Sequence, residues 1–315
     1  MAEGSATNGH ARGKLTTLAE AAGLVKDGDH VALSGFACAR NATAFSHELI
    51  RQGRRDLTLS AAILGMDADL LVGAGRVKRL IYGGGSLDRF GPIQCVNRAY
   101  EQGTVVAEYY SSLAVCFRYL AGALGLPFMP IQSMLGSDLL KRLEEETATA
   151  NIREMDDPFT GEHVVLLRAL VPDVTVIYAH QADAEGNARI YGPIWENSEA
   201  AKAAKKVVVL TEELVSTDVI RQQPELTIIP SFRVDSVVHI PWGAHPTSLY
   251  KYYDHDEDHL RLWVRQARSD AGALEYIEQY VMQPKTHWEY LELVGGLPKL
   301  MSIKADPLLG YTPHS

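Results

Sequence analysis

Cysteine is scarce in this chain: only Cys38, Cys95 and Cys116 occur among 315 residues. Their number is odd and they lie far apart, which argues against a disulfide framework and against a cysteine-rich zinc site. So little cysteine fits a reducing compartment, and we expect a cytoplasmic location. Cys38 has no histidine beside it in the sequence to activate a thiolate, so we expect a packed side chain there rather than a nucleophile.

Two further absences limit the classes of partner. No stretch approaches the roughly 20 apolar residues that a membrane-spanning helix needs, so we expect no membrane insertion. Positive charge is not in excess, because 30 Lys and Arg stand against 39 Asp and Glu, a formal net charge of −9. Nucleic-acid binding needs clustered cations, so we expect no such partner. A small anionic ligand stays compatible, since one arginine or a few backbone N–H groups suffice.

The chain also lacks a Gly/Pro-rich linker and a short internal repeat that would divide it. Residues 1–13 are small and polar, and we expect a disordered tail there rather than a signal peptide. We expect residues 14–315 to form one domain with a helical, aromatic-rich C-terminal region. Its length suffices for a sizeable core.

Short apolar runs alternate with helical patterns along this domain. Strands are expected at 30–33, 57–60, 79–82, 105–109, 164–167, 174–178, 206–211 and up to 240, and helices at 45–50, 68–72, 113–124, 197–204 and 212–219. The charged segment 138–162 is interpreted as a solvated surface with a helix near 144–146. This alternation predicts an α/β fold: an open, mainly parallel sheet covered by helices.

The most informative segment is 179–193, which directly follows the apolar run 174–178. Open α/β sheets bind ligands at the carboxyl ends of their strands, so we expect chemistry in this segment. Asp183 and Glu185 stand close to Gly186 and Asn187. A carboxylate there is a candidate covalent nucleophile, but Asp, Gly and Asn are also the usual residues of tight turns. The residues alone leave both interpretations open.

The loop after the strand 30–33 is a candidate substrate-binding loop. It contains Ser34, Gly35, Phe36 and Arg40. Backbone N–H groups and the Arg40 guanidinium are suited to a carboxylate or an acyl carbonyl. The alternative is a strand-to-helix turn that merely needs small residues.

The loop after the strand 79–82 holds three consecutive glycines, Gly83, Gly84 and Gly85, followed by Ser86. Such a run costs backbone entropy and implies close approach by a ligand or another chain. Ser86 is then a candidate ligand of an acyl carboxylate. The alternative is a flexible surface loop.

Glu108 and His245 are single candidates whose role the sequence leaves open. Glu108 lies near the end of the strand 105–109, where a single carboxylate is suited to pair with an arginine. His245 either donates to a substrate or orients its loop. The aspartates and histidines of 254–259 lack the spacing of a metal site, so we expect a hydrated acidic turn and no metal.

These loops, taken in order, resemble the α subunits of the family I coenzyme A transferases, most closely the glutaconate CoA-transferase type. The matching segments are Gly28–Phe36, Gly73–Lys78, Ala123–Pro130, Asp157–Phe159, Ala179–Pro193, Gly243–Pro246 and Leu309–Tyr311. Each motif alone is weak. Their ordered sum covers nearly the whole chain and is specific for the family, though not for a substrate.

The resemblance implies a ping-pong enzyme that works as an α/β pair. In such enzymes a glutamate attacks the acyl-CoA thioester, and the resulting acyl-glutamyl anhydride becomes a glutamyl-CoA thioester, from which CoA passes to a second acid. The resemblance places that glutamate on the β subunit. The α subunits carry instead an Asp-x-x-Gly-Asn turn, matched here by Asp183, Gly186 and Asn187. Glu185 falls on a variable position of that turn, so we interpret this segment as structural.

We therefore predict the α subunit of a CoA transferase that acts on a small, dicarboxylic acyl-CoA. The expected partner is a β subunit, in an α/β heterodimer that dimerises further. Coenzyme A thioester is then a substrate, and we expect no permanently bound cofactor. Gly84, Gly85, Ser86 and the 34–40 loop would bind the acyl group, together with His245.

Two alternatives remain. Glu108 corresponds to an α-chain glutamate that acts as acid and base in a related ring-opening hydrolase branch, so an acyl-CoA hydrolase or decarboxylase is the first. The second is a non-catalytic ligand-sensing domain, as in some repressors of related fold. The short stretch before the first expected helix leaves no room for the helix-turn-helix that such repressors carry.

Overall fold

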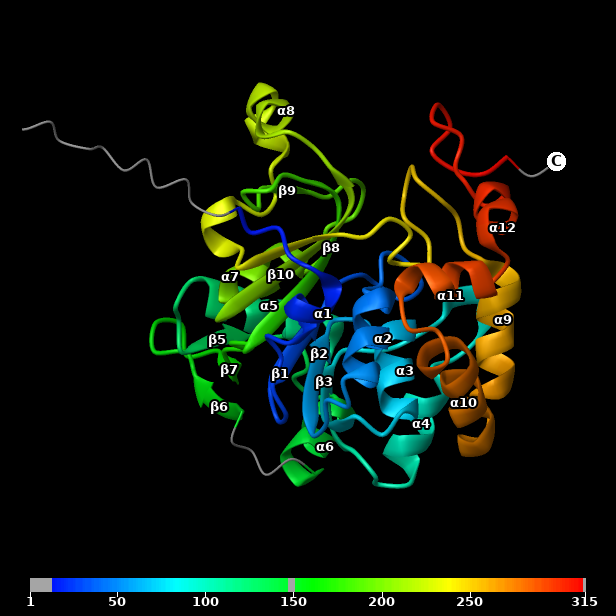
Figure 1. Ribbon diagram of the computed structural model, residues 1–315. Helices are drawn as coiled ribbons and strands as arrows, with labels where there is room; N and C mark the ends of the chain where they lie inside the picture. Colours follow the sequence, from blue (N-terminus) through cyan, green and yellow to red (C-terminus); the bar gives the residue numbers. More distant parts are fainter. Residues whose placement is uncertain (1–12, 147–150, 314–315) are drawn as a thin grey trace, which may run out of the picture.

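A central sheet of eight strands organises the molecule (Figure 1). The computed structural model describes residues 13–146 and 151–313. The strand order is β11-β10-β8-β1-β2-β3-β4, with β9 added beside β8. Every neighbouring pair is parallel except β8 and β9. The order runs outward from β1 in both directions, so the topological switch point lies between β1 and β8.

The strand bounds show how closely the apolar runs predict this sheet. The strands are β1 (His30–Leu33), β2 (Leu57–Ala61), β3 (Val77–Tyr82), β4 (Val106–Tyr109), β8 (Val174–Ala182), β9 (Ala188–Arg189), β10 (Lys206–Leu214) and β11 (Ser236–His239). Side chains alternate between the two faces: Val31 and Leu33 join one core cluster, whereas Ala32 joins another. The predicted open, mainly parallel sheet is confirmed.

Helices cover both faces of the sheet. On one face lie α2 (Thr43–Arg51), α3 (Met66–Gly73) and α4 (Gln94–Glu101), with α1 (Leu18–Ala22) beside α2; on the other lie α5 (Ser112–Ala123) and α7 (Asn197–Ala203), while α8 (Thr217–Gln222) follows β10. In Figure 1 the C-terminal helices stack outside α2 and α3. They are α9 (Glu257–Gln266), α10 (Asp270–Ile277), α11 (His287–Leu293) and α12 (Gly296–Ser302). Within the described ranges every helix is too short or too polar to cross a membrane.

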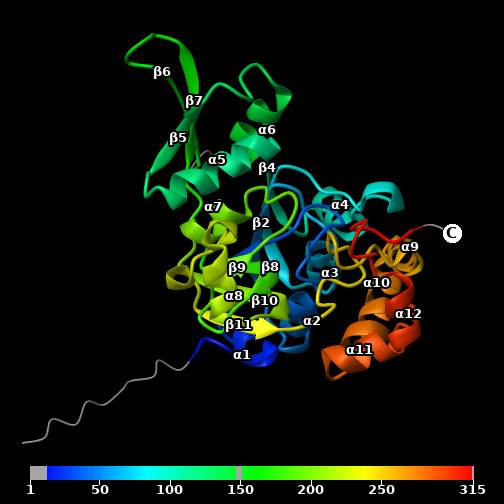
Figure 2. The ribbon, with the colours of Figure 1, turned by 90° about the horizontal axis from the view of Figure 1, so that it is seen from above.

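A second, antiparallel sheet projects beside α5 (Figure 2). Its strands, in the order β5-β7-β6, are β5 (Phe128–Ile131), β7 (His163–Arg168) and β6 (Ile152–Asp156); α6 (Asp138–Glu146) precedes β6. The solvated segment 138–162 contains β6 as well as α6, and the sequence analysis does not predict that strand. Arg153 to Asp156 are exposed along that edge strand, so the sequence shows no apolar alternation there.

The largest boundary differences from the prediction concern β8 and β10, which run side by side along their whole lengths. The register continues to Leu214 opposite Ala182. Residues 179–182 therefore belong to β8 and not to the loop, although His180 and Gln181 are polar. Residues 212–214 belong to β10, and the predicted helix begins only at Thr217. The expected tail lies, apart from Gly13, outside the described residues.

Candidate active site at the carboxyl edge of the sheet

The loops after β1, β2 and β3 meet at the carboxyl edge of the sheet. Gly83 N donates to Ala62 O at 3.0 Å, and Leu64 N donates to Gly84 O at 2.9 Å. Cys38 N approaches Asp88 Oδ2 at 3.4 Å, which links the first loop to the third. Two of the predicted substrate-binding loops are therefore neighbours in space.

The loop after β1 is held tightly by its own polar groups. Tyr178 N donates to Ser34 Oγ at 2.9 Å, so Ser34 ties β1 to β8 across the switch point. Gly35 adopts a φ of 96°, and a Cβ there would lie 2.6 Å from Ala39 O. Only glycine fits this position, because the left-handed region and the close carbonyl both exclude a side chain.

Arg40 is the charged group of this loop, and it is only 5% exposed. Its Nη1 donates to Asn197 Oδ1 at 3.0 Å and its Nη2 to Pro193 O at 3.2 Å. Burial lowers the pKa of the guanidinium to about 10, while the Glu196 carboxylate opposes that shift. Arg40 therefore keeps its positive charge at neutral pH.

A small cavity of about 70 Å³ lies above Arg40. Its wall includes Phe36, Tyr191, Ser248 and Tyr250. That space accommodates a carboxylate group or a few water molecules, but not a whole acyl chain. A buried arginine at its base suits the binding of a single anionic group.

Two of the three glycines after β3 are closely approached by other parts of this chain. A Cβ on Gly83 would lie 2.4 Å from Ser112 Cα, and one on Gly85 would lie 1.9 Å from Ile93 Cδ1. Ser86 Oγ accepts from Asp88 N at 2.9 Å, so its hydroxyl oxygen already closes a local turn. The close approach expected of the triglycine run is thus made by the start of α5 and by Ile93.

Three consecutive residues that the sequence analysis overlooked connect these loops. Trp195 stacks on Phe36 with ring centroids 3.9 Å apart. Glu196 Oε1 accepts from Ala62 N at 2.7 Å. Asn197 Oδ1 accepts from Gly35 N at 3.0 Å as well as from Arg40. In the sequence, only the position of residues 195–197 pointed to this role, because they follow the 179–193 segment and lie at the start of a predicted helix.

Glu196 is a buried carboxyl group at this edge, 3% exposed. Burial raises its pKa, although the Ala62 N–H bond and the Arg40 charge favour the ionised form. Its second oxygen, Oε2, has no hydrogen-bond partner among the described residues. The charges of Glu196 and Arg40 therefore stabilise each other in the protein interior.

The turn after β8 uses Asp183 as its organising group. Asp183 Oδ1 accepts from Gly186 N and Asn187 N, both at 2.9 Å, and Oδ2 accepts from Asn187 Nδ2 at 2.8 Å. Gly186 has a φ of 101°. Glu185 is exposed and borders a broad hollow on the side of α8, where Asn187 is a neighbour.

Glu108 lies away from these loops, on the face of the sheet that α5 covers. It is 1% exposed, and Arg79 Nη1 bonds its Oε1 at 2.7 Å. Its Oε2 accepts from Tyr110 Oη at 2.8 Å and from Asn151 Nδ2 at 3.0 Å. Both carboxylate oxygens are therefore occupied, which is the arginine pairing that the sequence left open.

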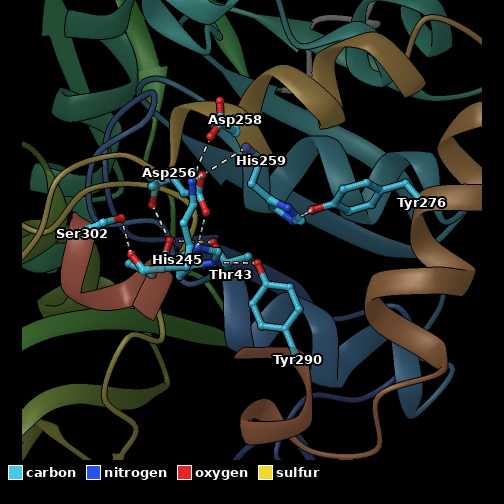
Figure 3. A network of polar contacts seen from close by, with 11 residues as sticks. Thr43, His245, Asp256, Asp258, His259, Tyr276, Tyr290 and Ser302 are labelled. Atoms are coloured by element: carbon cyan, nitrogen blue, oxygen red, sulfur yellow. Dashed lines mark hydrogen bonds and ion pairs between the residues drawn. The ribbon is translucent and has the colours of Figure 1, made fainter. Parts of the chain in front are cut away.

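His245 is part of a buried polar network among the C-terminal helices (Figure 3). Its Nδ1 bonds Tyr290 Oη at 2.8 Å and its Nε2 bonds Asp256 Oδ2 at 3.1 Å. Burial lowers the pKa of the imidazole. The segment that follows His245 also holds the backbone of Arg40, because Arg40 N donates to Ser248 O at 2.8 Å.

In the described part of the chain, neither the three cysteines nor the aspartates and histidines of 254–259 form a reactive centre. Burial raises the pKa of the Cys38 thiol, which disfavours a thiolate. Asp256 instead forms an ion pair with Lys299 at 2.9 Å and accepts from His259 N at 3.2 Å as the cap of α9. Across residues 13–146 and 151–313, no group of three or more His, Cys, Asp or Glu is arranged to hold a metal.

Comparison with known proteins decides the family. The chain matches the Coenzyme A transferase family over residues 15–239. It is 35% identical over 315 residues to the A subunit of glutaconate CoA-transferase from Acidaminococcus fermentans, covering 95% of this chain and 97% of that protein. The chain belongs to the coenzyme A transferase family.

Other members of the family extend this result. The crystal structure of the Acidaminococcus fermentans glutaconate coenzyme A-transferase superposes with a TM-score of 0.90 at 34% identity, over 96% of this chain and 98% of that one. An uncharacterized protein of Archaeoglobus fulgidus is 38% identical over 92% of this chain, which spans 64% of that protein's length. The predicted CoA-transferase-like fold is confirmed.

Two further CoA transferase relatives carry other activities in their names. The cholesterol ring-cleaving hydrolase IpdA subunit of Rhodococcus jostii is 29% identical over 86% of this chain and 92% of its own. The crystal structure of the decarboxylase AibA/AibB superposes with a TM-score of 0.74 at 32% identity, over 85% of this chain and 97% of that one. Membership of the family therefore leaves the reaction open between transfer, hydrolysis and decarboxylation.

Proposed function

We propose that this chain is the α subunit of a heteromeric CoA transferase that moves CoA between a small dicarboxylic acyl-CoA and a carboxylic acid. A partner β subunit supplies the covalent glutamate, and the two subunits form a heterodimer that dimerises further. The near full-length similarity to the corresponding chain of glutaconate CoA-transferase carries this proposal. The acyl-CoA is a substrate, and the reaction needs no permanently bound cofactor.

The state of the carboxylates at the carboxyl edge supports a nucleophile from outside this chain. A nucleophilic carboxylate must be accessible and free to attack. Glu196 is buried and accepts from Ala62 N, whereas Asp88 faces Cys38 N. Glu185 lies on the side of α8 and not among these loops. This chain then contributes the walls of the acyl site.

In this proposal Arg40 is the anion-binding group of the wall. The small cavity above it takes the free carboxylate of the acyl group, with Phe36 as an apolar side. Gly84, Gly85 and Ser86 border the same edge from the third loop. Asn197 fixes the positions of Gly35 and Arg40 through one amide oxygen. His245 contributes indirectly, by holding the segment that supports Arg40 N.

Mass spectrometry of the working complex tests the proposal. The chain is co-expressed with the partner encoded beside it, incubated with glutaryl-CoA, and digested. We expect a glutamyl-CoA adduct on the partner and transfer of CoA to added acetate. An adduct on Glu185 would refute the division of labour between the subunits. Release of free CoA without any adduct would refute transfer.

Hydrolysis or decarboxylation is the second candidate, favoured by the similarity to the ring-cleaving hydrolase and to AibA/AibB. Here Glu108 acts as acid and base, which requires Arg79 or Asn151 to release one of its oxygens. Glu108→Gln then abolishes turnover. In the transferase, the same variant retains the adduct on the partner, since Glu108 lies away from the loops at the carboxyl edge.

A further inference from the structure

A second cavity, with a volume of about 780 Å³, lies on the face of the sheet that α5 covers and reaches the amino end of β1. It is bordered by His30 at the start of β1 and by the segment 168–171 that leads into β8. None of the loops after β1, β2 or β3 lines it. Its volume falls in the range of ordinary small-molecule sites.

Charge distinguishes this cavity from the rest of the chain. Arg79, Arg118 and Arg168 line it, whereas Glu108 is its one lining carboxylate. Burial and the charge of Arg118 lower the pKa of His30 to about 4, so this imidazole is neutral at pH 7. The lining is therefore net positive in a chain whose formal charge is −9.

Arg118 carries an incompletely bonded charge in this cavity. It is 1% exposed, and its Nε donates to Arg168 O at 2.8 Å. Its Nη1 has no hydrogen-bond partner among the described residues and lies 3.7 Å from Glu108 Oε2. A buried guanidinium with an unsatisfied donor is costly. A bound anion would complete its surroundings.

Arg168 offers a free cation at the mouth of the same cavity. Its side chain is exposed, and no hydrogen bond or ion pair holds it within residues 13–146 and 151–313. Arg79 is 41% exposed although it pairs with Glu108. Apolar side chains complete the wall, namely Leu126, Leu170 and Val171.

We propose that this cavity is a binding site for a small organic anion, separate from the site at the carboxyl edge. Arg168 donates a hydrogen bond to a carboxylate or phosphate oxygen of the ligand. The positive charges of Arg79 and Arg118 attract the same anionic group. The hydrocarbon part of the ligand packs on Leu126, Leu170 and Val171. The Glu108 charge limits the affinity, because it offsets one of the three arginines.

Isothermal titration of the purified full-length chain at low salt tests this site. The probes are glutarate, butyrate and inorganic phosphate, so that a carboxylate source and a phosphate source are distinguished. Tighter binding of glutarate or butyrate identifies a carboxylate ligand, and tighter binding of phosphate identifies a phosphorylated one. The absence of saturable binding by all three would overturn the proposal.

Three variants locate the binding. Arg168→Gln is expected to weaken it about tenfold or more, as for a lost charged hydrogen bond, and Arg168→Lys to retain most of it. Glu108→Gln is expected to strengthen it several-fold. Arg268→Gln, an exposed arginine outside the cavity, is the matched control. An Arg168→Gln variant that binds as tightly as the wild type overturns the proposal. Because no turnover is measured, the outcome is independent of the transferase reaction.

Discussion

At the scale of single residues, the triglycine run shows how differently adjacent glycines are constrained. A Cβ on Gly83 would meet the backbone of Ser112 at 2.4 Å and 2.6 Å. A Cβ on Gly84 would meet only Ile63 Cδ1, the end of a flexible side chain, at 2.9 Å. The backbone of α5 cannot move away as a side-chain methyl group can, so Gly83 is required and Gly84 is not.

We predict that Gly83→Ala destabilises the folded chain by about 2 kcal/mol, a typical cost of overpacking. Gly84→Ala is the matched control and should change the free energy of unfolding by less than about 0.5 kcal/mol. Urea unfolding of the three proteins, followed by circular dichroism, measures both values. Equal stability of the two variants would contradict the assignment of the contact to Gly83.

Asn197 is a residue whose role is visible only in the folded chain. Its Oδ1 accepts from both Gly35 N and Arg40 Nη1. We predict that Asn197→Ala destabilises the chain by about 1–3 kcal/mol, the cost of leaving buried donors unpaired. In the complex it should also raise the KM for the acyl-CoA more than it lowers kcat, because Arg40 loses its alignment.

The isosteric variant Asn197→Asp keeps an acceptor at the same place and serves as the control. It should restore most of the stability and of the KM. If alanine and aspartate gave the same KM, Asn197 would not position Arg40.

At the scale of elements, the C-terminal helices enclose an unusual group of neutral histidines around Tyr290. His47, His245, His259 and His287 each lie with their ring centroid 4.8–6.2 Å from that of Tyr290. None of the four is more than 6% exposed. Burial lowers the pKa of His259 to about 3 and that of His287 to about 4. Tertiary packing thus keeps these imidazoles uncharged.

We predict that the chain loses stability as the pH falls from about 6.5 towards 4. In this window the unfolded chain binds protons at histidines that stay neutral in the folded chain, so lowering the pH favours unfolding. Each such histidine contributes about 1.4 kcal/mol per pH unit. Urea unfolding between pH 7.5 and 4.5 measures the slope.

The variant His259→Gln should reduce this slope by about one proton, and Gln can still bond Tyr276 Oη, which lies 2.6 Å from His259 Nε2. His239→Gln, at an exposed position at the end of β11, is the control. A slope that is the same in wild type and His259→Gln would refute the role of the buried histidine.

At the scale of the whole molecule, the C-terminal helices complete the main core although the family match ends at residue 239. Trp263, Tyr276 and Val281 belong to the same core cluster as Phe45 and Leu70. Trp263 Nε1 also donates to Asp69 Oδ2 at 2.9 Å. The boundary of the family match is therefore not a boundary of the folded unit.

We predict that a fragment ending at His239 fails to fold, because burial of Trp263 and Tyr276 alone contributes roughly 4 kcal/mol each. This loss is comparable to the whole stability of a typical domain. Size-exclusion chromatography and dye binding of the purified fragment measure the outcome. A fragment ending at Asp306 removes mostly exposed residues, such as Leu308 at 96%, and should stay folded. A monodisperse, cooperatively unfolding 1–239 fragment would contradict a single domain over 14–315.

The strands of the sheet were predictable wherever their buried residues form a continuous apolar stretch in the sequence. The prediction at 30–33 coincides with β1, and 206–211 captures most of β10. It failed where pairing overrode composition: Glu212 and Glu213 continue β10 because β8 runs beside them. It also missed β6, whose exposed side chains carry no periodic signal.

The candidate site divides in the same way. The loops after β1 and β3 were recognisable from their small residues, and the order of the motifs was enough to predict the family that the comparisons confirm. The residues 195–197 that join those loops had no signal of their own. Their contacts link positions more than 130 residues apart, which no local pattern records.

Local apolar periodicity and the order of the motifs were enough to determine the α/β alternation, the parallel sheet and the membership of the coenzyme A transferases. Which candidate residues lie close together became clear only in the folded chain. Folding places Arg40, the triglycine loop and Asn197 at one edge, Glu108 among arginines on the face below α5, and His245 inside the C-terminal layer. The reason is physical: burial, charge pairing and the close approach of backbones depend on distances between segments that are remote along the chain.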